Sequence, residues 1–373
     1  GIWQPVWLEW KSPLHIQDIR WTPLAQQASF NVIVKLSAIP QKPTRIMVQL
    51  TLRGEVLVED SYLAQGQETE RLIQLPIDLL AVRWNDVFWS PERPNLIDAV
   101  VTLEEAGATV DEVLSYAGLR SAEVRDGRFH LNDHPYFLRT VLQQGYWPES
   151  LLTAPSPDAL RREVELIKDL GFNGARLHQK VEDPRFLYWC DRLGLIIWGE
   201  MANSFIFDAD SAERLTREWM DVLKRDYSHP CIVTWVPVNE SWGVPALLHD
   251  ERQRDFLRAL YFLTKTFDPT RPVVDNDGWE HMVTDIITIH DYNASGETLW
   301  QRYGTEEGLN EILTTGRPLH KKTLLEGHQV DLDTTIMITE FGGISYAPEA
   351  GQRWYGYATV KTETDYLDKI DEL

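Results

Sequence analysis

From residue 136 to the end of the chain, short apolar runs alternate with segments of helical periodicity. The runs have the length and composition of buried strands, and they are Tyr136–Leu142, Asn173–Leu177, Leu195–Met201, Cys231–Val238, Val273–Asp275, Asp285–His290 and Thr335–Thr339. Helical patterns follow most of them, beginning near Ser156 and spanning Pro184–Leu193, Ser211–Tyr227, Glu251–Phe267, Glu306–Thr314 and Thr364–Leu373. Such a βα repeat builds a parallel sheet, which most often closes into an eight-stranded TIM barrel. We therefore expect an α/β TIM barrel over residues 121–373.

The first 120 residues carry a different pattern. They consist of short alternating or β-branched runs, such as Ala28–Ile39 and Thr44–Gly54, and turn residues such as Gly66 separate these runs. Several short strands within about 100 residues are typical of a β-sandwich. We expect an all-β, immunoglobulin-like sandwich over residues 1–120, and a hairpin at Asn132-Asp133 that leads into the barrel.

The composition disfavours several kinds of partner. A formal net charge of −21 argues against binding to nucleic acid, whose backbone is also negative. No apolar run approaches the roughly 20 residues that a membrane span needs, so we expect no membrane partner. Cys190 and Cys231 have no CxxC spacing, and we expect them in the core rather than in a disulfide or a zinc site. The sequence has no glycine-rich phosphate loop and no dinucleotide motif, and we expect no cofactor.

Polar and acidic side chains follow the apolar runs at their C-terminal ends. Asn239 and Glu240 follow one run, and Glu340 follows the last. The corresponding positions of the other runs hold Gln143, Gln144, Arg176, His178, Glu200, Asp275, Asn276, Asp277, His290, Asp291 and Tyr292. Because the active site of a TIM barrel lies at the C-terminal strand ends, we expect these groups to converge there.

Two carboxylates that face each other across a barrel mouth suit the hydrolysis of glycosides. One carboxylic acid gives a proton to the leaving oxygen, and the other carboxylate attacks the anomeric carbon. A single glutamate at a strand end could simply cap a helix or pair with an arginine, but Glu240 and Glu340 together favour catalysis. The sequence leaves open the separation that decides between retention and inversion of the anomeric centre.

The chain is rich in tryptophan, with 15 residues. Trp242 and Trp279 lie close to proposed strand ends, where their flat faces would suit sugar rings. For any single tryptophan, packing in the core is the simpler explanation. The two residues are therefore candidates for substrate binding.

Several motifs resemble those of glycoside hydrolase family 2, the β-galactosidase and β-glucuronidase family. The segments "VNESWG" and "ITEFGG" look like its acid/base and nucleophile motifs, and "GFNGARLHQKVEDPRFLYWCDRLGLIIWGEM" looks like its second and third barrel strands. "VFWSPERPNLIDAVVTL" and "SYAGLRSAEV" resemble its immunoglobulin-like domain, and "GIWQPVWLE" resembles the end of its N-terminal sugar-binding jelly roll. The resemblance covers nearly the whole chain.

This resemblance implies a retaining β-glycosidase, a hydrolase that removes terminal β-linked sugars by double displacement. Glu340 would be the nucleophile and Glu240 the acid/base. Asn239 would hydrogen-bond the sugar 2-hydroxyl. Arg176 and Tyr292 would lie beside the carboxylate of Glu340.

The other strand-end residues carry less specific expectations. Glu200 matches an acidic position of the family and would support the site without contacting substrate. Substrate contacts are expected from His178, His290, Asp275, Asp277, Trp242 and Trp279. Asx turns within the loop explain the two aspartates as well as a substrate contact does. Some family galactosidases bind magnesium through a glutamate and a histidine, but Ser204 and Ile206 occupy those positions here, and we expect no metal.

The resemblance also implies that the chain is a shortened form of a longer protein. Residues 1–9 would be the tail of a jelly roll, and the residues after Glu340 leave no room for an eighth barrel strand. We expect an open barrel that associates readily and has little activity. An inactive or sugar-binding-only fragment is thus the alternative to an active glycosidase. The sequence leaves open the sugar, the aglycone, homo-oligomer formation and the compartment, with a cytoplasmic location slightly favoured.

Overall fold

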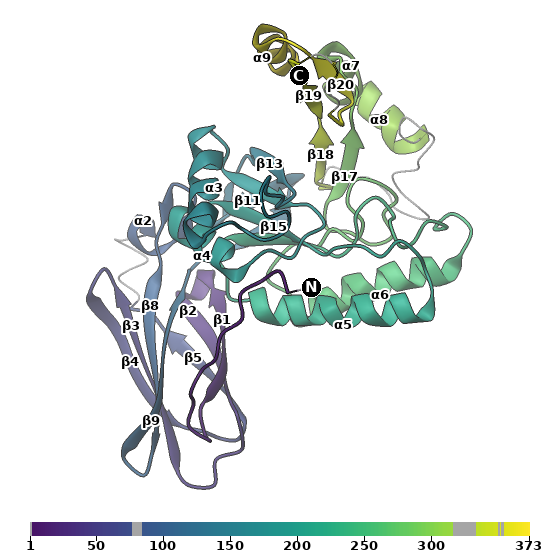
Figure 1. The fold of residues 1–373 in the computed structure, drawn as a ribbon. Helices are drawn as coiled ribbons and strands as arrows, with labels where there is room; N and C mark the ends of the chain where they lie inside the picture. Colours follow the sequence, from purple (N-terminus) through teal and green to yellow (C-terminus); the bar gives the residue numbers. More distant parts are fainter. Residues whose placement is uncertain (1, 77–83, 316–332, 350, 352–353) are drawn as a thin grey trace.

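The computed structural model describes residues 2–76, 84–315, 333–349, 351 and 354–373, in an all-β part and an α/β part (Figure 1). One antiparallel sheet of the all-β part has the order β1 (Ile16–Leu24), β2 (Ser29–Leu36) and β5 (Glu68–Gln74). The other has the order β4 (Glu55–Leu63), β3 (Thr44–Leu52), β8 (Ile97–Glu105) and β9 (Ala108–Ala117). A single apolar cluster joins the two sheets, which confirms the expected sandwich.

Alternation of apolar residues along the strands builds this core. In β2, Phe30, Val32, Val34 and Leu36 are fully buried, while the side chains between them are partly exposed. β3 follows the same pattern of alternate burial. Each such side chain contributes about 1.5–3 kcal/mol when it leaves water, so the pattern fixes which face of each strand turns inward.

Short elements connect the strands of the sandwich: η1 (Ala25–Gln27) follows β1, and α2 (Trp84–Val87), β6 (Trp89–Ser90) and β7 (Arg93–Pro94) precede β8. The two parts of the chain are linked by β10 (Ala122–Arg125), β11 (Arg128–Leu131) and β12 (His134–Pro135). The turn between β11 and β12 holds Asn132 and Asp133 at φ values of 54° and 65°. Two-residue hairpin turns of type I′ need positive φ at both positions, and asparagine and aspartate tolerate it. The hairpin predicted at these residues is confirmed.

The α/β part contains parallel strands in chain order. One sheet holds β13 (Thr140–Gln143), β14 (Gly174–Leu177), β15 (Ile196–Glu200) and β16 (Ile232–Val236). β17 (Ile287–Asp291) pairs in parallel with β18 (Ile336–Phe341). The run predicted as a strand at Val273–Asp275 lies between these sheets, but it is not a regular strand. Val273 of this run forms an isolated parallel bridge with Trp235 of β16. Asp277, two residues beyond the run, forms another with Asn239, which follows β16.

Helices follow the strands as the βα repeat predicts. They are α3 (Pro157–Asp169), α4 (Pro184–Leu193), α5 (Ala209–Asp226), α6 (Glu251–Phe267), α7 (Gly296–Tyr303), α8 (Glu306–Thr315) and α9 (Glu363–Glu372). The bounds predicted for α4 and α6 are confirmed. For α4 the local sequence explains the bounds, because Asp183 caps the first turn and Gly194 follows the last residue at a φ of 76°.

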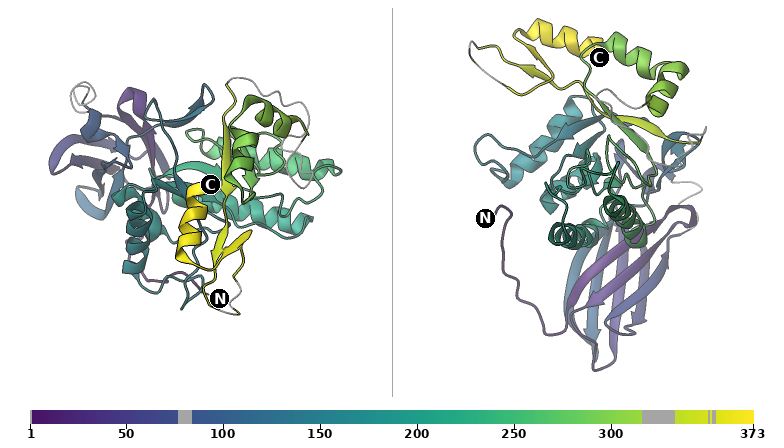
Figure 2. Two further views of the ribbon diagram at one scale, coloured as in Figure 1. Left: turned by 90° about the horizontal axis from the view of Figure 1, so that it is seen from above. Right: turned by 90° about the vertical axis from the view of Figure 1, so that its right-hand side faces the viewer.

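Three C-terminal elements were not expected from the sequence: α7, β19 (Ile344–Tyr346) and β20 (Ala358–Val360). β19 and β20 pair in parallel with each other, and with α9 they form a small unit that projects from the barrel strands (Figure 2). Among the described residues, no strand pairs with the outer edge of β13 or of β18. Within that part of the chain the barrel is therefore open, as expected.

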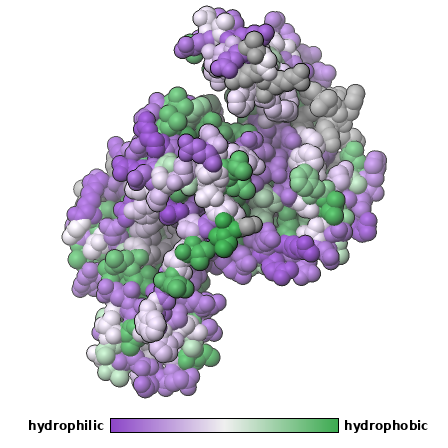
Figure 3. Space-filling view, viewed as in Figure 1, coloured by the Kyte–Doolittle hydropathy of each residue, from purple (hydrophilic) through white to green (hydrophobic). Residues whose placement is uncertain are grey.

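The surface in Figure 3 is mostly hydrophilic, and apolar side chains gather along the N-terminal segment. Ile2, Val6 and Leu8 in this segment are largely exposed. In the described ranges, no helix combines the length and the apolar character that crossing a bilayer requires.

Candidate active site

The two glutamates singled out by the sequence meet at the C-terminal strand ends. Glu340 lies on β18, directly opposite His290 on β17. Glu240 follows β16 and has a φ of 51°, a left-handed conformation that residues other than glycine seldom adopt. One carboxylate oxygen of Glu240 and one of Glu340 lie within 4.8 Å of each other. Glu340 is buried, whereas Glu240 is partly exposed.

Arg176 organises the buried side of the site. Both of its Nη atoms lie 2.6 Å from Oε1 of Glu340. Its Nε lies 2.7 Å from Oδ2 of Asp277 and 3.2 Å from Oε2 of Glu200. Burial alone would lower the pKa of Arg176, but the charges of the three carboxylates raise it above its ordinary value. A permanent cation therefore lies at the base of the site.

Tyr292 holds the other oxygen of Glu340, because its hydroxyl donates a hydrogen bond to Oε2. Burial and the charge of Glu340 raise the pKa of Tyr292, so the hydroxyl stays protonated and remains a donor. His178 lies on the other flank, with Nδ1 3.6 Å from Oε1 of Glu340 and 3.4 Å from Oε1 of Glu200. Arg176 and Tyr292 thus lie beside Glu340, at the positions expected from the sequence.

His290 links Glu240 to Asp277. Its Nδ1 lies 2.8 Å from Oε1 of Glu240, and its Nε2 lies 3.1 Å from Oδ2 of Asp277. Burial would lower the pKa of His290, but the charge of Asp277 raises it to about 9. Burial would raise the pKa of Glu240, but the hydrogen bond and charge of His290 bring it below the usual value. At neutral pH the proton expected on Glu240 lies on His290 instead.

The backbone at Gly278 makes room for this histidine. Gly278 has a φ of 79°, and a Cβ atom there would lie 2.2 Å from Cδ2 of His290. Its carbonyl also accepts a hydrogen bond from the backbone N–H of His290 at 3.3 Å. Only glycine satisfies both the conformation and the close approach, so the loop before β17 is built around the imidazole ring.

The structure gives Asp275, for which a substrate contact was predicted, partners within its own loop. Its carboxylate is fully buried and accepts hydrogen bonds from Nδ1 of His281 and the backbone N–H of Met282, both at 2.7 Å. Asp277 is also fully buried, and it backs Arg176 and His290 rather than lining an open surface. Short-range loop capping explains the first aspartate, because the chain turns back on its carboxylate.

The remaining predicted residues lie at different depths. Asn239 is buried, and its Oδ1 accepts a hydrogen bond from Arg176 at 2.8 Å. Its Nδ2 has no hydrogen-bond partner among the described residues. Trp242 is 45% exposed and packs edge-on against Phe205, whereas Trp279 is half-buried. Glu200 lies beneath the site and accepts a hydrogen bond from the backbone N–H of Gln179 at 2.8 Å.

Sequence reasoning missed the aromatic ring next to the nucleophile candidate. Tyr357, just before β20, stacks on Tyr292 with ring centroids 3.7 Å apart and planes 10° apart. The only sequence signal is the aromatic segment "WYGY", which follows Glu340 in the chain.

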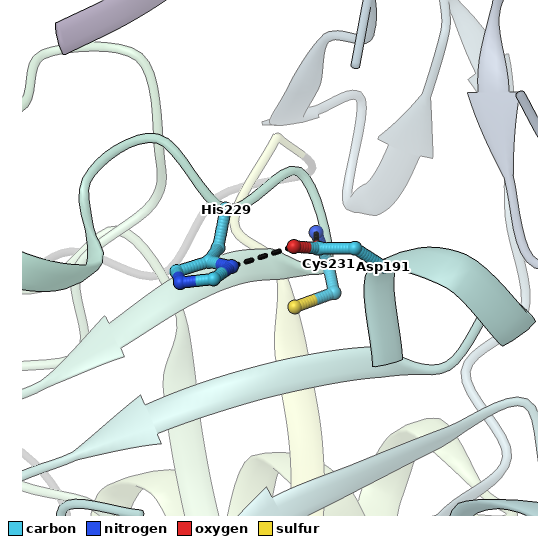
Figure 4. A group of neighbouring side chains, drawn as sticks. All are labelled: Asp191, His229 and Cys231. Atoms are coloured by element: carbon cyan, nitrogen blue, oxygen red, sulfur yellow. Dashed lines mark hydrogen bonds and ion pairs between the residues drawn. The ribbon is translucent and has the colours of Figure 1, made fainter. Parts of the chain in front are cut away.

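A second cluster, away from these carboxylates, has spacing that would suit a metal ion. Asp191, His229 and Cys231 each bring one ligand atom within 4.8 Å of the others (Figure 4). However, Asp191 already accepts hydrogen bonds from His229 Nδ1 at 2.5 Å, Tyr116 Oη at 2.8 Å and the backbone N–H of Cys231 at 2.9 Å. Burial also raises the pKa of the Cys231 thiol, which disfavours the thiolate that a metal needs. The cluster joins β9 of the sandwich to the barrel.

Comparisons with known proteins agree with this architecture. Residues 14–120 match the family model "Glycosyl hydrolases family 2", and residues 122–327 match the model of its TIM barrel domain. A β-galactosidase of Pectobacterium atrosepticum is 31% identical over 308 residues, which cover 77% of this chain and 28% of that protein. A β-galactosidase of Vibrio cholerae is 28% identical over 314 residues, which cover 77% of this chain and 29% of that protein. The chain thus spans less than a third of the length of these relatives.

Solved structures share the fold at lower identity. A β-galacturonidase from Eisenbergiella tayi, in complex with galacturonate, has a TM-score of 0.73 and 18% identity, covering 97% of this chain and 62% of that one. β-Glucuronidase 3 of Bacteroides uniformis has a TM-score of 0.68 and 20% identity, covering 90% and 40%. Since the TIM-barrel model of the family alone matches more than half of the residues, the chain belongs to glycosyl hydrolase family 2.

Proposed function

We propose that the protein is a retaining β-glycosidase that hydrolyses terminal β-linked sugars, with Glu340 as nucleophile and Glu240 as acid/base. One observation carries this proposal: an oxygen of each carboxylate lies within 4.8 Å of the other at the strand ends. Retaining enzymes separate their carboxyl groups by about 5–5.5 Å, whereas inverting enzymes leave about 6.5–9.5 Å for a water molecule. The spacing supports retention.

In the first step Glu340 attacks the anomeric carbon. Arg176 and Tyr292 hold its two oxygens, so the carboxylate keeps one orientation without needing to reorganise. The new bond joins Glu340 to the sugar, and the bond from the anomeric carbon to the leaving oxygen breaks. The product of this step is a covalent glycosyl-enzyme ester.

The proton for the leaving oxygen comes from the pair of Glu240 and His290. Transfer from Nδ1 of His290 to Oε1 of Glu240 breaks one N–H bond, forms one O–H bond and neutralises both groups across the 2.8 Å contact. Glu240 then passes the proton to the leaving oxygen. In the second step its carboxylate takes a proton from water, the water oxygen attacks the anomeric carbon, and Glu340 leaves as a carboxylate.

Asn239 is the proposed partner of the sugar 2-hydroxyl. Its Oδ1 is committed to Arg176, which fixes the amide, while the buried Nδ2 has no partner among the described residues. A buried donor without a partner costs about 1–3 kcal/mol, and a sugar hydroxyl would supply the missing acceptor.

The test is turnover by this chain of 2,4-dinitrophenyl β-glycosides of galactose, glucuronic acid, galacturonic acid and mannose. We expect hydrolysis of one of them, and the first-formed sugar in NMR spectra should be the β-anomer. The corresponding 2-deoxy-2-fluoro glycoside should label Glu340, as peptide mass spectrometry would detect. An α-anomer as first product, or label on another residue, would contradict the proposal.

A second candidate function is sugar binding without turnover. The open edges of β13 and β18 within the described ranges favour it, because an incomplete barrel leaves one side of the site without a strand. This candidate predicts binding of the free sugar by calorimetry together with no release of dinitrophenol.

A further inference from the structure

An aromatic stack extends from the carboxylates toward the solvent. Tyr292, which donates to Glu340, stacks face to face on Tyr357 at 3.7 Å. The ring of Tyr355 then lies edge-on to Tyr357, with centroids 5.6 Å apart and planes 74° apart. The three rings thus form a continuous aromatic wall on the flank of the site.

The backbone is shaped to hold this wall in place. Gly343 has a φ of 65°, and a Cβ atom there would lie 2.8 Å from Cδ2 of Tyr357 and 3.0 Å from Cδ1 of Tyr292. The backbone N–H of Tyr357 donates to the carbonyl of Gly343 at 2.8 Å. β19 and β20 begin at the next residues and pair Ile344 with Ala358. A short parallel pair and a glycine therefore fix the position of the stacked rings.

Exposure rises steeply along the wall. Glu340 is 6% exposed, Tyr357 is 50% exposed and Tyr355 is 87% exposed. Leaving large apolar ring faces in water is unfavourable by about 25 cal/mol per Å², so a ligand that covers them gains binding energy. Burial, the hydrogen bond with Tyr355 and then the charges of Glu240 and Glu340 raise the pKa of Tyr357. The ring of Tyr357 consequently lies within electrostatic reach of both carboxylates.

We propose that Tyr357 and Tyr355 bind the leaving group of the substrate and select groups with a flat apolar ring face. The inference rests on the proposed function, which puts the terminal sugar in the buried end of the site. Arg176, Asn239 and Glu340 enclose that end, whereas the leaving group must point past Glu240 toward solvent. An aryl group and a second pyranose both present such a face.

Binding of non-hydrolysable thioglycosides tests the inference without requiring turnover. Phenyl, disaccharide and methyl 1-thio-β-glycosides that share one terminal sugar would be titrated into this chain by calorimetry. One such set of three ligands would be used for each of galactose, glucuronic acid, galacturonic acid and mannose. We expect the phenyl or the disaccharide ligand to bind at least about threefold more tightly than the methyl one. Of the phenyl and disaccharide ligands, the one whose affinity exceeds that of the methyl ligand by the larger factor identifies the class of leaving group.

Variants assign that preference to the wall. Tyr355→Ala, which removes an exposed ring that does not stack on Tyr292, should remove most of the preference, a fall of at least about threefold, and leave the methyl ligand unaffected. Tyr357→Phe keeps the stack and should retain the preference. Tyr346→Ala is the matched control, because this 44% exposed ring packs with Tyr366 in the same β19–α9 unit.

Two results would overturn the inference: equal affinity for the three ligands in the parent chain, binding of none of them included, or an unchanged preference in Tyr355→Ala. Failure of the proposed hydrolysis looks different. It would leave the phenyl or disaccharide preference intact while dinitrophenyl glycosides stay uncleaved.

Discussion

The Nδ1 atom of His290 lies 2.8 Å from Oε1 of Glu240, and this contact couples the ionisation of the two side chains. Asp277 stands behind the imidazole, and Arg176 stands behind Asp277. Glu340, 3.5 Å from Nδ1, faces the same histidine from the neighbouring strand. The pair of His290 and Glu240 therefore titrates as a unit within a site crowded with carboxylates.

Replacing His290 with asparagine should move the basic limb of the pH–rate profile. The shared proton should sustain cleavage of poor leaving groups up to the pKa of His290, at about 9. In His290→Asn the proton must reside on Glu240 alone, so activity should be lost at lower pH, toward the ordinary carboxyl range. The measurement is kcat/KM for a methyl glycoside between pH 4 and 10, and an unshifted basic limb would argue against proton sharing.

Replacing Glu240 with glutamine should separate substrates by their leaving groups. Cleavage of a methyl glycoside should fall by about 10²–10⁴-fold, because its leaving oxygen needs the proton. Formation of the glycosyl enzyme from a dinitrophenyl glycoside should change far less, since that leaving group departs as an anion. The burst of dinitrophenol in stopped-flow experiments measures this step. An equal loss with both substrates would count against the acid role of Glu240.

Replacing Arg176 with methionine should destabilise the fold by about 3–5 kcal/mol at pH 7, because buried carboxylates lose their cation. Burial would raise the pKa of Asp277, but Arg176 holds it well below the unfolded value of 3.8. The stabilisation from ionised Asp277 is present above the unfolded pKa and is lost as the pH falls toward the folded pKa. The difference in unfolding free energy between the parent and Arg176→Met should therefore narrow below about pH 4.

Urea unfolding of the parent and of Arg176→Met at pH 7 and pH 3.5 checks this expectation. Arg185→Met is the control, because Arg185 pairs with Asp183 at a side chain that is 44% exposed, and such pairs contribute about 0–1 kcal/mol. A loss of unfolding free energy of the same size in both variants would contradict a special role of the buried guanidinium.

Replacing His229 with asparagine should destabilise the junction between sandwich and barrel more at pH 6 than at pH 9. Burial would lower the pKa of His229, but the charge of Asp191 raises it above the unfolded value of 6.5. Its stabilisation is therefore complete below pH 6.5 and is lost as the pH rises through the folded pKa. We expect a cost of about 1.5–3 kcal/mol at pH 6 from chemical denaturation. A cost that does not vary with pH would show that His229 is not charged there.

The strand ends could be predicted because apolar periodicity and polar termini are local properties of the sequence. The bounds of α4 and α6 follow from caps that lie within a few residues of each helix. By contrast, α7 has only 8 residues, and β19 and β20 have 3 each. Segments this short carry too few repeats for a periodic signal, and tertiary pairing determines them.

The roles of individual site residues were less accessible to sequence reasoning. Asp275 and Asp277 are two positions apart, yet one binds its own loop and the other binds Arg176 from a distant strand. The ionisation of Glu240 depends on His290, which is 50 positions away in the chain. Such contacts are properties of the assembled barrel mouth, and no local pattern encodes them.

The short unit that follows Glu340 could evolve separately from the rest of the site. Glu340, the proposed nucleophile, and the ring of Tyr357 lie within one stretch of chain, on β18 and next to β20, and Gly343 lies between them. Recombination or insertion confined to residues 341–358 could exchange the groups that an enzyme accepts while leaving Arg176, Glu240 and His290 in place. If the proposed function holds, new leaving-group preferences would then arise by replacement of a single segment, without rebuilding the residues proposed to cleave the bond.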